Sequence, residues 1–222
     1  MTLIGPTRSG KTHMALTLAE MCRHILVLAT KRSDPLVAEL SRKGYLVTGD
    51  LSQILWTERE NDRGATQPVH RKVVYWPQFP ERMSSSQRLD AQTALFARAI
   101  DWAEKTGGWA VLVDETMWMA DRLRLGKELD SLWYQGRTQG ISVIACAQRP
   151  SRVPRLAFSQ ADYLFLAKFA DKRDIETLRD ISSSIPKELI DDTIRGLSKD
   201  AHEFLFIDTV HDQLAVTVAP PR

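Results

Sequence analysis

The feature that most constrains this chain is a glycine-rich run close to its start. Residues 5–12 read GPTRSGKT, a full match to the pattern G-x-x-x-x-G-K-[ST]. In this pattern the glycines let the backbone curl so that successive N–H groups point at phosphate oxygens. The lysine adds a charge near the β- and γ-phosphates, and the last hydroxyl reaches Mg²⁺. We call residues 5–12 the phosphate loop, and the pattern predicts that it binds a nucleoside triphosphate, ATP, with Mg²⁺.

The segments on either side of the phosphate loop have the character that such a loop requires. Residues 2–4 are a short apolar run that predicts a strand, and residues 13–22 carry apolar side chains at helical spacing. A glycine–lysine turn without a ligand is the alternative, but the strand–loop–helix order favours phosphate binding. The residues expected to contact the nucleotide are Gly5, Pro6, Thr7, Arg8, Ser9, Gly10, Lys11, Thr12 and His13.

Length and composition indicate one domain. A chain of 222 residues with 43% hydrophobic side chains can bury one full core with additions, but hardly two independent cores. We expect the nucleotide-binding core to cover about residues 1–170, and residues 171–222 to add a helical and hairpin extension. The net charge of +2 is too small to indicate a nucleic-acid partner by itself.

The placement of apolar residues favours a protein of the cytoplasm. Cys22 and Cys146 lie in apolar runs, so we expect core residues rather than a disulfide or metal ligands. No apolar run reaches the ~18 residues needed to cross a bilayer, and no signal peptide precedes the phosphate loop. We therefore expect a soluble cytoplasmic protein without a membrane partner, located in the host cytoplasm if the chain is viral.

Strand and helix patterns alternate along the chain. Apolar runs of strand length occur at residues 25–29, 45–47, 72–76, 110–113, 141–147 and 163–167. Helical patterns occur at residues 35–42, 87–105, 127–138, 171–181 and 186–195. Residues 57–70 read as a polar loop, and residues 202–207 and 214–218 predict a C-terminal β-hairpin. This alternation implies an α/β fold with a mostly parallel central sheet flanked by helices.

The strand at residues 110–113 delivers two carboxylates at its carboxyl end, where α/β sheets bind ligands. Asp114 would hold Mg²⁺ together with Thr12. Glu115 is placed to orient and deprotonate an attacking water, which is the work of a general base in hydrolysis. The alternative for Glu115 is an acid at the start of a helix, where the macrodipole favours a negative charge.

The following strand, residues 141–147, ends at Gln148. If this strand lies between the phosphate-loop strand and the strand that precedes Asp114, Gln148 faces the γ-phosphate, and its amide can both donate and accept hydrogen bonds. A residue that caps the turn before Pro150 is the alternative. The order of these motifs resembles that of P-loop NTPases of the RecA-like, additional-strand type, and we expect their core strand order, 5-1-4-3-2.

Residues 136–151, GRTQGISVIACAQRPS, strongly resemble the matching segment of FtsK/HerA-type DNA-translocating ATPases. The order of phosphate loop, Asp114-Glu115 and Gln148 extends the resemblance over about residues 1–170. The short motor domain is most similar to viral members of the family, the phage genome-packaging ATPases among them. Lys31 and Asp34 are also similar to positions in phage ATPases of this kind.

The resemblance implies an ATP-hydrolysing motor that moves double-stranded DNA, most simply into a capsid, with a capsid portal as docking partner. It also implies a homo-oligomeric ring, a hexamer or a pentamer, in which an arginine of the neighbouring subunit completes each site. Arg137 is the first candidate for this arginine and Arg149 the second. The alternative for Arg137 is a charge in the last turn of the helix at residues 127–138, where the dipole favours a cation.

Other functions remain open at this point. A related ATPase that drives virion assembly or protein secretion would need a membrane or coat partner instead of DNA. A small-molecule kinase has no use for Glu115, and a nucleotide-binding regulator has none for the pair of Glu115 and Gln148.

Basic residues in the loops that follow two strands are the expected non-specific DNA contacts. They are Arg122, Arg124, Lys127, Arg149, Arg152 and Arg155. Basic loop residues are commonly just a solvated surface, which is the alternative here. Trp118, between Met117 and Met119, is expected to pack in the core or in an interface more than to stack on a base.

Overall fold

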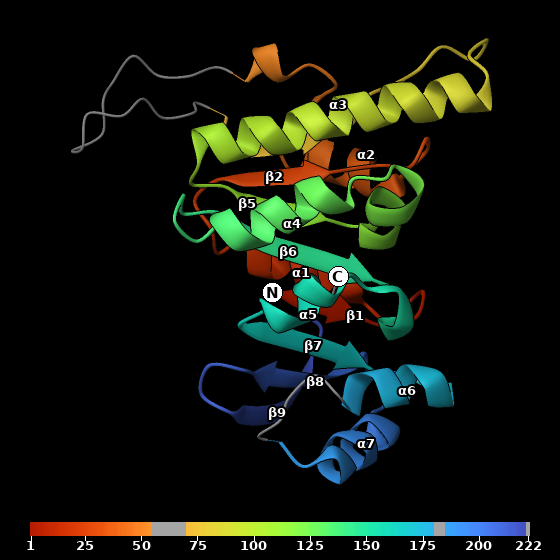
Figure 1. The fold of residues 1–222 in the computed structure, drawn as a ribbon, viewed down its shortest axis with the longest axis vertical. Helices are drawn as coiled ribbons and strands as arrows, with labels where there is room; N and C mark the ends of the chain where they lie inside the picture. Colours follow the sequence, from red (N-terminus) through yellow and green to blue (C-terminus); the bar gives the residue numbers. More distant parts are fainter. Residues whose placement is uncertain (55–69, 180–184, 221–222) are drawn as a thin grey trace.

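The structure is a computed structural model that describes residues 1–54, 70–179 and 185–220. Almost all of the polar loop predicted at residues 57–70 therefore lies outside the described residues. Within the described ranges, nine strands form one sheet in the order β3-β4-β2-β5-β6-β1-β7-β8-β9 (Figure 1). The strands are β1 (Thr2–Ile4), β2 (Ile25–Leu28), β3 (Leu46–Thr48), β4 (Lys72–Tyr75), β5 (Ala110–Val113), β6 (Ser142–Ala147), β7 (Tyr163–Ala167), β8 (Glu203–Asp208) and β9 (Gln213–Val218).

The order of the core strands confirms the additional-strand prediction. Strand β6 lies between β1 and β5 and runs parallel to both, with Leu3 opposite Cys146 and Leu112 opposite Ile144. Counted along the chain, the five strands β1, β2, β5, β6 and β7 appear in the sheet as 5-1-4-3-2. Strands β7, β8 and β9 pair antiparallel, so the predicted C-terminal hairpin is also confirmed.

The helices follow from capping signals and apolar spacing. Asp34 accepts a hydrogen bond from the backbone N–H of Leu36 at 3.0 Å and begins α2. Ser84 and Gln87 form a reciprocal capping box, so α3 begins at Ser85, two residues before the predicted start. The helices are α1 (Lys11–Ala19), α2 (Pro35–Arg42), α3 (Ser85–Thr106), α4 (Gly126–Gln135), α5 (Arg155–Ser159), α6 (Lys172–Arg179) and α7 (Lys187–Gly196), with the short turns η1 (Leu51–Gln53), η2 (Trp118–Arg122) and η3 (Pro150–Arg152).

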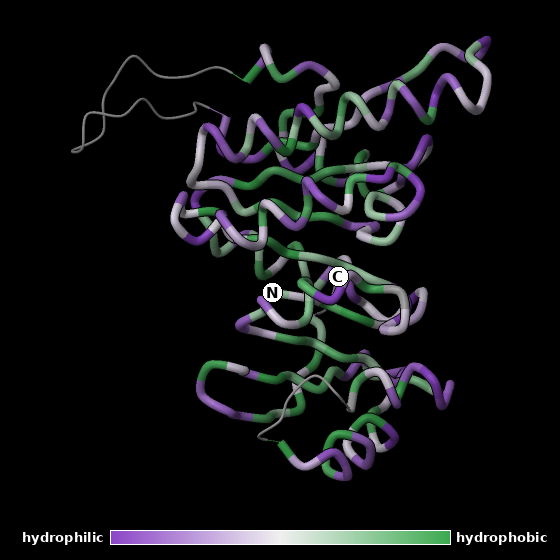
Figure 2. Tube along the Cα trace, in the orientation of Figure 1, coloured by the Kyte–Doolittle hydropathy of each residue, from purple (hydrophilic) through white to green (hydrophobic). Residues whose placement is uncertain are grey.

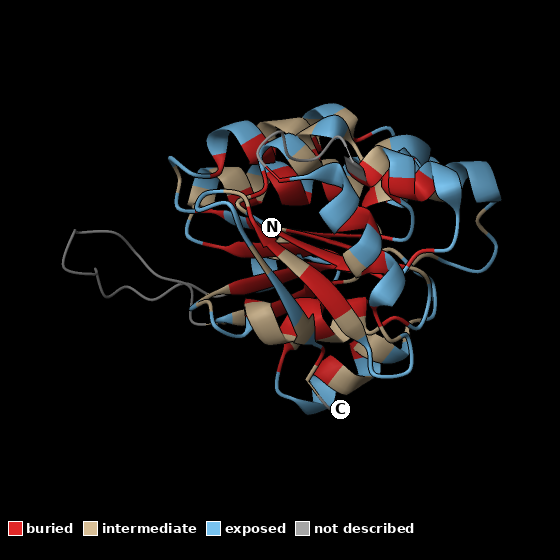
Figure 3. Cartoon of the chain, turned by 90° about the horizontal axis from the view of Figure 1, so that it is seen from below, coloured by how far each residue is buried: buried red, intermediate tan, exposed pale blue. Residues whose placement is uncertain are grey.

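The sheet is covered on both faces, which explains why its central strands are continuously apolar. Helices α1 and α2 pack on one face, while α3, α4 and α5 pack on the other. Helices α6 and α7 cover β7 and β8. The hydrophobic residues follow the central strands (Figure 2), and buried strands lie between helices whose outer surfaces are exposed (Figure 3). Cys146 is buried in this core and Cys22 is partly buried, both as free thiols.

One predicted helix ends earlier than expected. The helix predicted over residues 127–138 is α4, which ends at Gln135. Beyond it, the backbone N–H of Ile141 donates to the carbonyl of Gly136 at 2.7 Å, and Thr138 donates to Gln135 at 3.1 Å, so the chain tightens into turns. Arg137 therefore lies in a turn after the helix, and the prediction that placed it in the last helical turn is wrong.

None of the helices in the described ranges is both long and apolar enough to cross a membrane.

Candidate nucleotide-hydrolysis site

The phosphate loop connects β1 to α1, as predicted, and its glycines are required by its geometry. Gly10 forms the N-cap of α1 with a φ of 93°. Residues that carry a side chain rarely adopt this backbone conformation. A Cβ on Gly5 would lie 2.5 Å from the Cβ of Ala167 on β7. A Cβ on Gly10 would lie 3.2 Å from Ala219, so the C-terminal extension reaches this loop. The loop thus presents the amino end of α1, where N–H groups attract anions.

The side chains inside the loop fit a phosphate ligand. The Nζ of Lys11 donates to the carbonyl of Pro6 at 3.0 Å, so it lies within the curl of the loop. Burial lowers the pKa of Lys11, although Asp114 and Glu115 act in the opposite direction. The hydroxyl of Ser9 is buried and has no hydrogen-bond partner within the described parts of the chain. A phosphate in the loop would give both groups the anionic partner that they lack.

The two residues predicted to hold Mg²⁺ meet in the structure. The hydroxyl of Thr12, on α1, donates to Oδ1 of Asp114 at 2.8 Å. Asp114 follows β5, and its side chain is only 9% exposed. A hydroxyl and a carboxylate that converge beside a phosphate loop form an oxygen ligand set that suits Mg²⁺. The structure brings Thr12 and Asp114 together; their role as metal ligands stays a prediction.

Glu115 lies at the centre of a second set of contacts. Its carboxylate accepts from Nε2 of Gln148 at 3.2 and 3.3 Å. The hydroxyl of Thr7 donates to Oε1 of Gln148 at 3.5 Å, a long contact. Gln148 therefore bridges the phosphate loop and Glu115, using its donor and its acceptor at once. These side-chain contacts favour the site interpretation of both residues over a helix-start acid and a turn cap.

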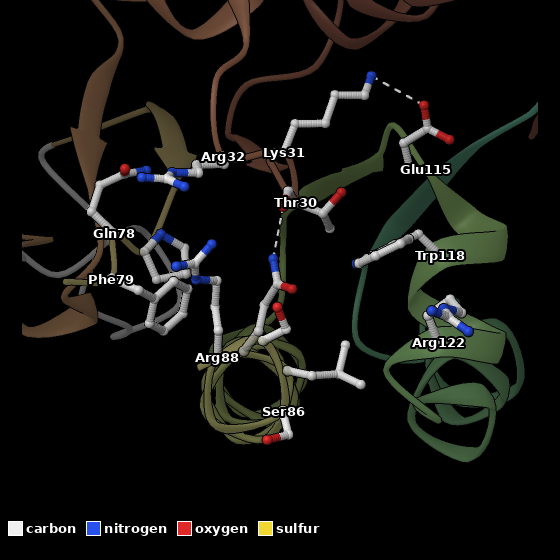
Figure 4. A pocket seen from close by; sticks show the side chains of 14 residues that line it. Thr30, Lys31, Arg32, Gln78, Phe79, Ser86, Arg88, Glu115, Trp118 and Arg122 are labelled. Atoms are coloured by element: carbon white, nitrogen blue, oxygen red, sulfur yellow. Dashed lines mark hydrogen bonds and ion pairs between the residues drawn. The ribbon is translucent and has the colours of Figure 1, made fainter. Parts of the chain in front are cut away.

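Lys31 is the site residue for which the sequence carried the weakest signal. It follows β2, and its Nζ lies 3.0 Å from Glu115 (Figure 4). The same Nζ lies 3.2 Å from Asp114. Burial by itself lowers the pKa of Lys31, but the two carboxylates outweigh burial and raise it above its ordinary value. The lysine thus balances the two negative charges that the site concentrates. A basic residue at the carboxyl end of a central parallel strand is the pattern that could have indicated this role.

The two candidate arginines lie at opposite edges of the sheet. Arg137 precedes β6, whereas Gln148 follows it, so Arg137 is at the edge away from its own phosphate loop. Its guanidinium forms an ion pair with Asp162. Arg149 follows Gln148 at the edge of the site, is exposed, and lies 4.0 Å from Asp171. Arg137 therefore lies away from its own phosphate loop, while Arg149 lies near it; their roles stay predictions.

Several basic residues expected to touch DNA are exposed near the site. They are Arg122, Arg124, Lys127, Arg149 and Arg155. Exposure is compatible with both a DNA surface and a solvated one. Met119 is buried in the core, whereas Trp118 is 38% exposed and lines a cavity beside Glu115, so of the two expected places for Trp118 only an interface stays a prediction.

No protein-family model matches the sequence, and no curated protein does. Solved structures match its whole length. The genome packaging NTPase B204 of Sulfolobus turreted icosahedral virus 2, in complex with sulfate or AMPPCP, aligns with a TM-score of 0.65 and 14% identity; the alignment covers 100% of this chain and 96–97% of B204. B204 of Sulfolobus turreted icosahedral virus, a DNA-packaging ATPase, aligns with a TM-score of 0.62 and 21% identity over 100% and 97% of the chains.

A cellular ATPase has the same fold. The type VII secretion ATPase EccC of Thermomonospora curvata aligns with a TM-score of 0.56 and 13% identity, over 98% of this chain and 25% of that chain. Because the sequence identities are this low, the alignments show a common fold and nothing finer. The chain therefore has the fold of the P-loop ATPases of the FtsK/HerA type, the genome-packaging and secretion ATPases.

Proposed function

We propose that this protein is a Mg²⁺-dependent ATPase that moves double-stranded DNA in viral genome packaging. The observation that carries the hydrolytic part is the position of Glu115, held between Lys31 and Gln148 beside the Thr12–Asp114 pair. The full-length similarity to packaging NTPases of nearly the same size supports the packaging part. The secretion ATPase EccC has the same fold, but this chain covers only 25% of that chain.

In this proposal the phosphate loop binds the triphosphate through its N–H groups and Lys11. Thr12 and Asp114 hold Mg²⁺, which when bound supplies positive charge to the phosphate oxygens. Glu115 takes a proton from the water that attacks the γ-phosphate in line. Gln148 touches both the phosphate loop and Glu115, so its amide links the state of the phosphate to the position of the base.

The proposed assembly is a homo-oligomeric ring, hexameric or pentameric, around duplex DNA, docked on a capsid portal. Arg137 is exposed at the edge remote from its own site, a position that supports a contact with the next subunit rather than with its own nucleotide. Exposed arginines and lysines in the loops after β5 and β6 would contact the DNA backbone without sequence preference.

A related ATPase that drives secretion or virion assembly is the second candidate, favoured by the similarity to EccC. The deciding experiment measures the rate of ATP hydrolysis with and without linear duplex DNA, alongside the particle mass in solution. We expect stimulation by DNA and a mass of five or six subunits. Hydrolysis that DNA does not change would refute the DNA motor and favour the second candidate, and no Mg²⁺-dependent hydrolysis in verified rings would refute both.

A further inference from the structure

A cavity of about 700 Å³ opens directly beside the hydrolysis site (Figure 4). Lys31 and Glu115 line one end of it, so the cavity and the site share two side chains. Helix α3 forms its floor, and the segment after β4 and the η2 turn form its two walls. Its volume lies within the range of about 300–1,000 Å³ that small-molecule sites occupy.

The charges of the side chains that line the cavity favour an anionic ligand. Of the described residues, four cationic side chains line it, Lys31, Arg32, Arg88 and Arg122, and one acid, Glu115. Lys31 is neutralised by the site carboxylates and Arg32 by a glutamate outside the cavity. Among the ion pairs of the described residues, none involves Arg88 or Arg122. A ligand with a negative group would therefore pair with these two guanidinium groups.

Arg88 carries a direct sign of a missing partner. Among the described residues, its buried Nε finds no hydrogen-bond acceptor, and its Nη2 makes only a long contact of 3.4 Å with the carbonyl of Met83. An unpaired donor on a buried charged group is costly unless a ligand satisfies it. Arginine presents its donors in a planar fork that matches the oxygens of a phosphate.

The walls of the cavity carry aromatic rings. Trp118 from η2 and Phe79 face each other across it (Figure 4), and Trp118 is 38% exposed there. The guanidinium of Arg122 lies 5.8 Å from the centre of the Trp118 ring, which places a charge beside a stacking surface. The N–H of Leu123 donates to the carbonyl of Trp118 at 3.0 Å, a π-helical bond, and such turns are frequent at functional sites.

We propose that this cavity binds a nucleotide unit, with its base stacked on Trp118 and its phosphate on Arg88 and Arg122. A nucleotide carries both a flat base and an anionic phosphate within a single monomer. An acidic peptide supplies the anion without the ring, and an apolar molecule leaves the arginines unpaired. The unit comes either from a free nucleotide or from an unpaired nucleic-acid strand, whose bases present a free face.

The position of the cavity gives such binding a consequence for hydrolysis. Lys31 and Glu115 line the cavity as well as the hydrolysis site, so a ligand in the cavity would change the surroundings of the base. This step rests on the proposed function, because it assumes that Glu115 is the base in ATP hydrolysis. Binding in the cavity can be measured without turnover, so the two proposals can fail separately.

The test uses the intact chain with its phosphate loop saturated by a non-hydrolysable ATP analogue and Mg²⁺. An eight-nucleotide single strand that contains 2-aminopurine is titrated, and its fluorescence falls when the base stacks. We expect Trp118→Ala to weaken binding by about 10-fold, the scale of one base stacked on an aromatic ring. Arg88→Gln should weaken binding and reduce the salt dependence by about one phosphate contact.

The matched control is Arg98→Gln, which removes an exposed arginine of the same helix α3 away from the cavity. It should bind the strand like the wild type. If Arg88→Gln unfolds, as a thermal melt would report, Arg122→Gln removes a phosphate partner from a different element. Adenosine monophosphate and a duplex of the same length are titrated as competitors.

Each outcome of these titrations supports or overturns the proposal. Loss of binding in the cavity variants but not in the control supports the proposal, and displacement by adenosine monophosphate at similar concentrations identifies free nucleotide as the source. Equal binding by all variants overturns it. A duplex that binds as well as the strand, unaffected by Trp118→Ala, overturns the stacking, and binding of an acidic aromatic peptide in place of the strand assigns the cavity to a protein partner.

Discussion

Replacing Glu115 with glutamine tests the general base with almost no change of shape. The carboxylate lies 3.0 Å from Nζ of Lys31 and accepts from Nε2 of Gln148 at 3.2 Å. A glutamine retains an oxygen that can accept from Gln148, but it cannot take a proton from water. A positioned base contributes about 10²- to 10⁴-fold, so we expect the rate of ATP hydrolysis to fall by about 10²-fold or more.

The same substitution should change folding stability only slightly. The ion pair that it removes is partly exposed, with 46% of the Lys31 side chain and 21% of the Glu115 side chain accessible. Such pairs contribute about 0.2–1 kcal/mol to the free energy of unfolding. In a domain of this size, about 1 kcal/mol shifts the Tm by roughly 2–4 °C. We therefore expect Glu115→Gln to have a Tm within about 4 °C of the wild type, although its rate of ATP hydrolysis falls strongly.

The assay combines single-turnover hydrolysis, binding of a fluorescent ATP analogue with Mg²⁺, and a thermal melt. Glu115→Gln should bind the analogue normally and release phosphate slowly. Asp114→Ala serves as the comparison, because it removes the partner of Thr12 and should abolish turnover by disturbing Mg²⁺. If Glu115→Gln turns over at nearly the wild-type rate while Asp114→Ala does not, Glu115 is only an acid at a helix start and the reasoning is wrong.

Three further substitutions test the remaining assignments. Lys11→Ala removes the charge of the phosphate loop and should abolish nucleotide binding or turnover; near-normal hydrolysis would remove that assignment. Gln148→Ala should leave basal hydrolysis but reduce stimulation by DNA, and unchanged stimulation would return Gln148 to a turn cap. Arg137→Ala subunits mixed with Lys11→Ala subunits should recover activity that neither has alone, if Arg137 crosses to the neighbour. Full activity of Arg137→Ala by itself, or no recovery in verified mixed rings, would move the assignment to Arg149.

The sequence by itself determined the features that depend on neighbouring residues. The phosphate loop is such a feature, because its glycine spacing dictates the curl of the backbone. The start of α2 at Pro35 is another, since Asp34 caps it within two residues. The additional strand β6 was predicted with Gln148 at its end, because apolar runs that alternate with helices imply a parallel sheet with a shared carboxyl edge. These patterns were enough to predict a mostly parallel sheet with Asp114, Glu115 and Gln148 at one edge, while the strand order followed from the resemblance to additional-strand P-loop NTPases.

Only the tertiary structure decided which side chains meet across that edge. Lys31 contacts Glu115 from 84 positions away in the chain, through the pairing of β2 with β5, and no local pattern encodes that distance. The turn after α4 directs Arg137 to Asp162, against the expectation of a longer helix. Trp118 and Met119 are neighbours, yet one lines a cavity and the other lies in the core. Such differences arise from packing between distant segments, which local sequence does not specify.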